Sequence, residues 1–262
     1  MHTDDFSILK FFDLSWRIFI RNIRAAHRKS ILGLVWVIIP PIVNAAVWVL
    51  LNENNVISFE GMGNIQYPIF VLSGIILWQI FLDALQIPFN TMLTFEPIIK
   101  SLYFKRSAIL GATGLEIVFN TIIRLVILII GLIVFQVAFE INGLLFLLPM
   151  MVLLLLGFGI SLWLMPIFLL YKDVNRLLGF VTQFAFFLTP IIYQLPSNDT
   201  FFGKLAFWNP VTPPLLAGRD LILIGETTHW AGVGWVFLLS TILVISGWRL
   251  FIVTCERIIE RI

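Results

Sequence analysis

The sequence is poor in the residues on which disulfides and metal sites depend. Its 262 residues include one cysteine, Cys255, and three histidines that lie far apart, His2, His27 and His229. A lone cysteine excludes an internal disulfide and a cysteine-cluster metal site, and the histidine spacing matches no zinc motif. We therefore expect no metal site on this chain.

The sequence also lacks motifs that are typical of catalytic and nucleotide-binding sites. Ser161 follows Gly159 but lacks the second glycine of an intramembrane serine protease, and we interpret it as a small packing residue. The pair Gly203-Lys204 is not a P-loop, because the position five before Gly203 holds Asn198 instead of glycine. We predict no catalytic residue and no nucleotide site, so uphill transport would need a partner protein or an ion gradient.

Charge is also scarce, and long apolar segments take its place. Only 12% of the residues are charged, against roughly 25% in soluble domains, and 60% are hydrophobic. A helix needs about 20 apolar residues to cross a bilayer. We predict an all-α polytopic membrane protein, with residues 1–262 forming a single transmembrane domain. The predicted spans are about residues 31–51, 67–91, 107–139, 144–170, 177–195 and 230–253.

The positive charges are unevenly distributed between the connecting segments. With six crossings, fourteen of the seventeen Lys and Arg lie on one side, while Lys204 and Arg219 lie on the other and Arg124 lies within a span. Cytoplasmic loops carry the excess of Lys and Arg. We therefore expect both termini in the cytoplasm of a bacterium, with the chain in the inner membrane.

The segment before the first span is basic and amphipathic. In residues 6–30, one helical face holds bases and another holds aromatic and aliphatic residues. The basic face comprises Lys10, Arg17, Arg21, Arg24 and Arg28, and the apolar face Leu9, Phe12, Trp16, Phe19, Ile20 and Ile23. Such a helix lies in the membrane interface, so we predict an interfacial helix here.

Residues 196–229 form an unusual outer segment. It contains two apolar stretches, residues 201–208 and 213–224, which are too short to cross a bilayer and are separated by prolines. We predict short re-entrant or interfacial helices. The alternative is an ordinary outer loop whose apolar residues pack on the bundle.

Four polar residues within the predicted spans are candidates for a functional or structural role: Asp83, Glu116, Asn120 and Arg124. The last three are four residues apart on one helix, so they form one stripe. Charges at this depth are costly and face a partner or water. Two interpretations stay open, an internal pair of Arg124 with Asp83 or a polar strip along a hydrated passage.

Aromatic residues exceed what interfacial belts need, with 25 Phe, nine Trp and four Tyr. Ordinary packing explains many of them, but a sugar ring also stacks on aromatic side chains. The candidates for a channel lining are Trp78, Phe81, Phe184, Phe187 and Tyr193.

Several short segments resemble one known family. They are RKSILGLVW (28–36) with Pro40, IKSLYFKR (99–106), KDV (172–174) followed by TPIIY (189–193), and WNPVTP (208–213) before Arg219-Asp220. Their order and spacing are similar to those of the permease subunits of ABC transporters that export polysaccharides such as O-antigen, capsule or teichoic acid. Lys105 departs from the family, which usually has proline before the arginine.

The resemblance implies a homodimer around a continuous polymer channel and a separate dimeric ATPase subunit that binds ATP and Mg. Residues 93–106 look like the coupling segment that docks into this ATPase, as an alternative to a loop anchored at lipid headgroups. The docking candidates are Phe95, Lys100, Leu102, Tyr103, Phe104, Lys105 and Arg106.

The resemblance also makes residues 6–30 a cytoplasmic gate helix. Arg24, Arg28 and Lys29 would meet the diphosphate of a lipid-linked glycan, while simple anchoring to anionic membrane lipids is the rival.

The sequence as a whole favours a non-enzymatic permease that moves a lipid-linked polysaccharide, O-antigen or capsule in type, from cytoplasm to periplasm. The alternatives are a permease for a smaller lipid or drug, a membrane glycan transferase or polymerase, and a non-transporting scaffold. We expect no cofactor on this chain and no nucleic-acid partner.

Overall fold

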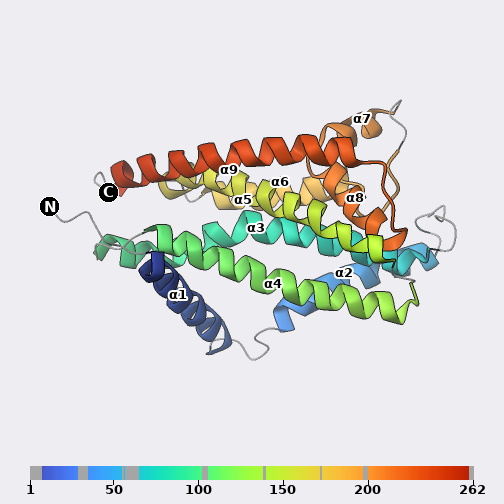
Figure 1. Cartoon of the computed structure of the whole chain (residues 1–262), viewed down its shortest axis with the longest axis horizontal. Coiled ribbons are helices and arrows are strands. Elements are labelled where there is room, and N and C mark those ends of the chain that lie inside the picture. The colour runs from blue at the N-terminus through green and yellow to red at the C-terminus, as the bar shows by residue number, and fades with distance from the viewer. Residues whose placement is uncertain are drawn as a thin grey trace.

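The computed structural model describes residues 8–28, 35–54, 56, 65–101, 106–137, 140–171, 173–196 and 200–259. All regular structure in these ranges is helical (Figure 1). The helices are α1 (Ile8–Arg28), α2 (Val35–Glu53), α3 (Tyr67–Ser101), α4 (Arg106–Val134), the 3₁₀ helix η1 (Ile141–Phe146), α5 (Leu147–Leu170), α6 (Asp173–Leu188), α7 (Phe201–Trp208), α8 (Thr212–Leu223) and α9 (Trp230–Ile259).

Five segments in the described part are long and apolar enough to cross a membrane. These are Val35–Glu53, Tyr67–Phe95, Ala108–Val134, Ile141–Leu170 and Trp230–Thr254. The prediction of an all-helical membrane protein is therefore confirmed at this level. With 16 residues, α6 is shorter than the span predicted for it.

The bundle is built around α3. This helix contacts α2, α4, α5, α6 and α8, and its first half is almost entirely buried. Figure 1 shows the end of α3, the start of α4 and the end of α9 at one end of the bundle, which we call the α3–α4 end. The short helices α7 and α8 lie at the opposite end, the α7–α8 end.

Glycines allow close packing on both sides of α5. A Cβ on Gly157 would lie 2.6 Å from the carbonyl oxygen of Phe81 in α3, and one on Gly247 of α9 would lie 2.9 Å from the Cβ of Leu162. Small residues let membrane helices approach in this way, and dispersion contacts then hold them together.

Four predicted boundaries were wrong. α3 remains helical to Ser101, through the start of the segment predicted at residues 93–106, and α6 begins at Asp173, before the predicted start of the fifth span at residue 177. α4 ends at Val134 instead of residue 139, because the chain closes a Schellman motif: Gln136 has φ 52°, and the amides of Gln136 and Val137 donate to the carbonyls of Ile133 and Leu132.

The predicted fifth span also ends early, at Leu188 instead of residue 195. Pro190 has no amide hydrogen and disfavours a helical conformation at Thr189, so the helix cannot continue. By contrast, the apolar stretches predicted at 201–208 and 213–224 correspond closely to α7 and α8.

Candidate functional site

Helix α1 lies across the bundle near its α3–α4 end (Figure 1). Ser15, Ile18 and Phe19 are buried, and the Phe19 ring meets Phe119 of α4 edge-on, with centroids 5.9 Å apart. A Cβ on Gly111 of α4 would lie 2.4 Å from the Ser15 hydroxyl oxygen. The two helices therefore pack without a gap at this point.

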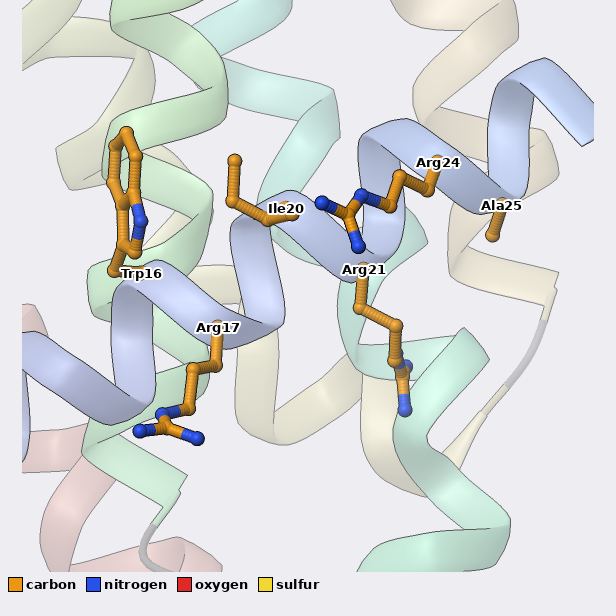
Figure 2. A pocket seen from close by; sticks show the side chains of 6 residues that line it. All are labelled: Trp16, Arg17, Ile20, Arg21, Arg24 and Ala25. Carbon is orange, nitrogen blue, oxygen red and sulfur yellow. The ribbon is translucent and has the colours of Figure 1, made fainter.

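The surface of α1 carries an open pocket of about 500 Å³, which we call the α1 basic pocket. It is lined by Trp16, Arg17, Ile20, Arg21, Arg24 and Ala25. Figure 2 shows the three guanidinium groups spread along the helix and not converging on one point. This arrangement suits an extended anionic group beside an apolar surface better than a single compact ion.

The three arginines of the α1 basic pocket have different partners. Arg17 donates through Nε to Asp13 at 2.8 Å, and the Arg21 guanidinium lies 4.1 Å from the ring centroid of Phe95 in α3. Arg24 is exposed and forms no ion pair among the described residues. Of the bases predicted to meet a diphosphate, the Arg28 side chain and Lys29 lie outside the described residues.

Phe95 was predicted to dock into a partner, but the structure buries it to 1% exposure. It packs in the core while Arg21 covers its ring face, so it links α1 to α3 instead of offering an exposed contact. The side chains of Lys100 and Arg106, and residues 102–105 entirely, lie outside the described residues. Docking by Lys100, Leu102, Tyr103, Phe104, Lys105 and Arg106 therefore stays a prediction.

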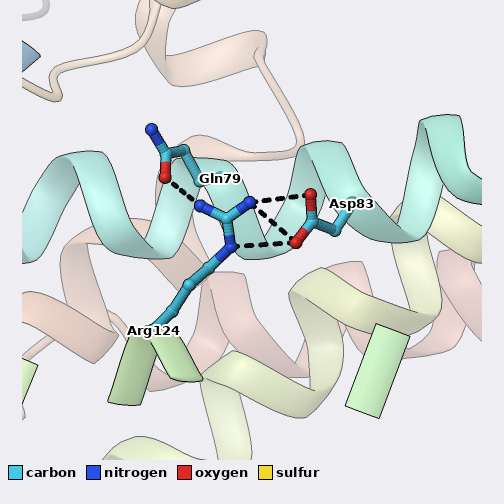
Figure 3. A network of polar contacts seen from close by, with 3 residues as sticks. All are labelled: Gln79, Asp83 and Arg124. Atoms are coloured by element: carbon cyan, nitrogen blue, oxygen red, sulfur yellow. Dashed lines mark hydrogen bonds and ion pairs between the residues drawn. The ribbon is translucent and has the colours of Figure 1, made fainter. Parts of the chain in front are cut away.

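A buried polar network connects α3 and α4 (Figure 3). Arg124 of α4 donates through Nε and Nη2 to the two carboxylate oxygens of Asp83, each at 2.8 Å, and through Nη1 to the side-chain oxygen of Gln79. Both members of the pair are largely buried. Of the two interpretations left open by the sequence, the structure therefore forms the internal pair. Two parallel bonds between a guanidinium and a carboxylate give strength and fixed orientation.

The rest of the polar stripe extends this network toward α1. Asn120 lies near the Asp83 carboxylate, and Glu116 lies near Asn22 of α1. The other side of Glu116 is less well satisfied, since its buried Oε2 has no hydrogen-bond partner in the described part of the chain. The stripe thus connects α1, α4 and α3 in sequence.

The aromatic candidates for a channel lining fall into two groups. Trp78 and Phe81 are buried, with Trp78 packed against Phe186 of α6 at 6.1 Å, so they belong to the core and line no surface of this chain. Phe184 and Phe187 are 56% and 54% exposed.

Of the exposed aromatic side chains of α6, Phe187 contacts α2. The Phe187 ring lies 6.3 Å from Trp48 of α2, and Tyr193 donates to the Phe187 carbonyl at 2.9 Å. Both helices carry exposed apolar side chains, and we call these residues together the α2–α6 face. Its exposed members include Trp36, Val43, Val47, Leu50, Phe180, Phe184 and Phe187.

Arg219 of α8 was not predicted as a site residue. It is 2% exposed, donates through Nη1 to the carbonyls of Pro190 and Ile191 at 2.9 and 3.3 Å, and stacks on Phe70 at 3.8 Å. It satisfies the carbonyls left free where α6 ends.

Comparison with known proteins identifies the family. The profile of the ABC-2 type transporter family matches residues 14–223, which is most of the chain. The chain belongs to the ABC-2 type transporter family. It is therefore an integral membrane subunit of the permease type, and the match includes α1 from residue 14 onward, the α3–α4 network and α8.

Two known transport proteins are similar to this chain over almost their full length. The O-antigen export system permease protein RfbA of Klebsiella pneumoniae is 21% identical over 245 residues, which is 92% of this chain and 91% of that protein. The polysialic acid transport protein KpsM of Escherichia coli is 24% identical over 248 residues, which is 89% of this chain and 90% of that protein.

Proposed function

We propose that this chain is the membrane-spanning permease subunit of an ATP-driven exporter that moves a lipid-linked polysaccharide of O-antigen or capsule type. The observation that carries the proposal is near-complete coverage by two relatives whose names refer to O-antigen export and polysialic acid transport. Polymer export also suits a chain whose sequence holds no P-loop and no catalytic motif, because the work would be done by another subunit.

We propose six crossings, with α6 as the fifth. At 1.5 Å per residue its 16 residues cover about 24 Å, short of a hydrocarbon core of about 30 Å. The irregular residues 189–196 would supply the rest. Non-helical backbone is tolerated at membrane depth only where protein satisfies it, and here Arg219 binds two of the carbonyls while Tyr67 donates to Ile192 at 3.1 Å.

With six crossings of a bacterial inner membrane, both termini would lie on the same side as the α3–α4 end. We propose that this side is the cytoplasm. Fourteen of the seventeen bases then lie on the cytoplasmic side. On the outer side Arg219 is buried, which leaves Lys204 as the exposed base there. α7, with Phe201, Phe207 and Trp208 exposed, would lie in the outer interface, and the buried α8 would be re-entrant.

We propose that two copies meet through the α2–α6 face and enclose the path of the polymer. The exposed aromatics of this face, among them Phe184 and Phe187, give sugar rings an apolar surface without fixed polar contacts. Buried Trp78 and Phe81 would support this surface from behind.

ATP and Mg would bind a separate ATPase subunit, docked at the α3–α4 end. The Arg21–Phe95 contact supports a direct link from that end to α1, because a displacement of the α3 terminus reaches α1 through it. α1 would then act as the cytoplasmic gate, with the α1 basic pocket, and Arg24 in particular, facing the phosphates of the lipid carrier.

The test is made in cells that lack this chain and synthesise the polymer. We expect full-length glycan to accumulate inside, and a plasmid copy to restore it to the surface. Loss of polymer synthesis, with no internal glycan, would point to a transferase or polymerase. Normal surface glycan together with failure to export a small lipid or drug would favour the smaller-substrate permease.

The requirement for an ATPase is tested separately in inverted membrane vesicles. We expect glycan uptake only when ATP and the partner subunit are both present. Uptake that persists without the ATPase subunit would refute this part of the proposal.

A further inference from the structure

A second pocket lies on α5 and α9, and it shares no lining residue with the α1 basic pocket. It has a volume of about 570 Å³ and is open to the surroundings, and we call it the α5–α9 groove. α5 contributes Trp163, and α9 contributes the other lining residues, which include Ile242, Ile245, Ser246 and Arg249.

Apart from Arg249, the polar groups that line the groove are hydrogen-bonded within the chain, and the other lining side chains are apolar. The indole Nε1 of Trp163 donates to Ser246 Oγ at 2.9 Å, and the Ser246 hydroxyl in turn donates to the Ile242 carbonyl. Trp163, Ile242 and Ile245 remain exposed. An acyl chain can therefore fill the groove without stranding a hydrogen-bond donor or acceptor.

Arg249 supplies the charge on this surface, and the apolar residues Leu250 and Val253 follow it along the groove. Its side chain is exposed, and no carboxylate among the described residues forms an ion pair with it. It follows Trp230 by about 28 Å along the helix, close to the end of the candidate span at Thr254. An arginine at that depth extends its head toward lipid phosphates while its stem stays in the apolar region.

We infer that the α5–α9 groove is a binding site for an anionic phospholipid, with one acyl chain in the groove and the phosphate at Arg249. Charge complementarity selects this occupant, because a neutral or zwitterionic lipid would fill the walls equally well but gain less from the Arg249 guanidinium, which has no ion pair within the described ranges. The inference requires α9 to span the membrane and does not depend on the exported substrate. The inner leaflet follows from the proposed orientation.

The test uses the full chain purified in detergent and native mass spectrometry with phosphatidylglycerol and phosphatidylcholine of identical acyl chains. We expect about fivefold better retention of phosphatidylglycerol, the effect of one basic residue near an anionic headgroup. Arg249→Gln should reduce retention to the level of phosphatidylcholine. Ile245→Trp, which fills the groove, should reduce binding of both lipids.

Arg176→Gln is the matched control, because Arg176 is an exposed arginine at a helix end, paired with Asp173 and outside the groove. It should leave the preference unchanged. Equal retention of the two lipids by the unmodified chain, or an unchanged preference in Arg249→Gln, would overturn the inference. A disulfide-linked dimer of Ile245→Cys in a Cys255→Ser background would do the same, since a second copy would then occupy the groove.

Discussion

Arg124 and Asp83 form a buried ion pair, and either charge would be costly at this position without its partner. Removing one partner of a buried pair leaves an uncompensated charge and costs about 3–5 kcal/mol, whereas replacing both is much less costly. We therefore expect Arg124→Met and Asp83→Leu each to lower the free energy of unfolding by several kcal/mol. The double variant should lose less than the sum, with a coupling energy of about 1–3 kcal/mol in a double-mutant cycle.

The chain contains a suitable reference pair. Arg176 and Asp173 are 3.6 Å apart, and their side chains are 89% and 91% exposed. The same cycle on this surface pair should give a coupling close to zero. A coupling energy at Arg124 and Asp83 as small as that of the reference pair would show that the buried contact contributes nothing to stability.

Gly74 marks the closest approach between α3 and the irregular segment after α6. A Cβ there would lie 2.5 Å from the Ile191 carbonyl oxygen, which cannot move freely because Arg219 binds it. We expect Gly74→Ala to destabilise by about 1–3 kcal/mol, lowering the thermal unfolding midpoint in detergent by several degrees. Gly114→Ala, with nothing within 4 Å, should leave the midpoint unchanged or raised. Equal midpoints in the two variants would contradict the close packing.

Single-residue roles were predictable only where both partners were conspicuous in the sequence. Arg124 and Asp83 stood out because charged residues are rare in apolar spans. Arg219 did not, because its partners are backbone carbonyls of Pro190 and Ile191, which carry no sequence signal. Phe95 was assigned to a docking surface because the sequence gives no signal for its cation–π contact with Arg21, which lies 74 positions away on another helix.

At the level of elements, the sequence predicted the positions of the helices better than the residues at which they end. The outer stretches corresponding to α7 and α8 were recognisable because prolines and short apolar runs delimit them. The end of α4 was missed because a Schellman closure at Gln136, without glycine, interrupts a segment that stays apolar. The sequence also did not show which side of α1 is buried, because this depends on packing against Gly111 and Phe119 of α4.

The docking of α1 on α4 gives an element-scale prediction. A branched side chain at Gly111 must displace Ser15 and Phe11, which approach its Cβ position to 2.4 and 2.8 Å. We expect Gly111→Val to weaken the docking by at least about 1 kcal/mol, so that amide hydrogen exchange of residues 8–28 in nanodiscs rises about fivefold or more.

Gly114→Val is the control for the change in helix propensity that the same substitution causes in α4, because Gly114 has no neighbour within 4 Å. Its α1 amides should exchange as in the unmodified chain. Unchanged exchange in Gly111→Val would mean that α1 is held by contacts other than this one.

For the molecule as a whole, the decisive question is whether α6 crosses the bilayer. Arg176 in its first turn and Lys204 in α7 flank the segment, and both side chains are exposed. In a Cys255→Ser background, we expect Arg176→Cys to react with a membrane-impermeant maleimide only after the membrane is opened. Lys204→Cys should react in intact spheroplasts.

Glu140→Cys, in the connection between α4 and α5, calibrates the outer side, because two helices long enough to span flank it. It should react like Lys204→Cys. If Arg176→Cys and Lys204→Cys react on the same side, α6 does not cross and the end of α9 lies opposite to the prediction. The bases of residues 93–106 and those of the tail would then face different compartments, and a single cytoplasmic ATPase could not engage both.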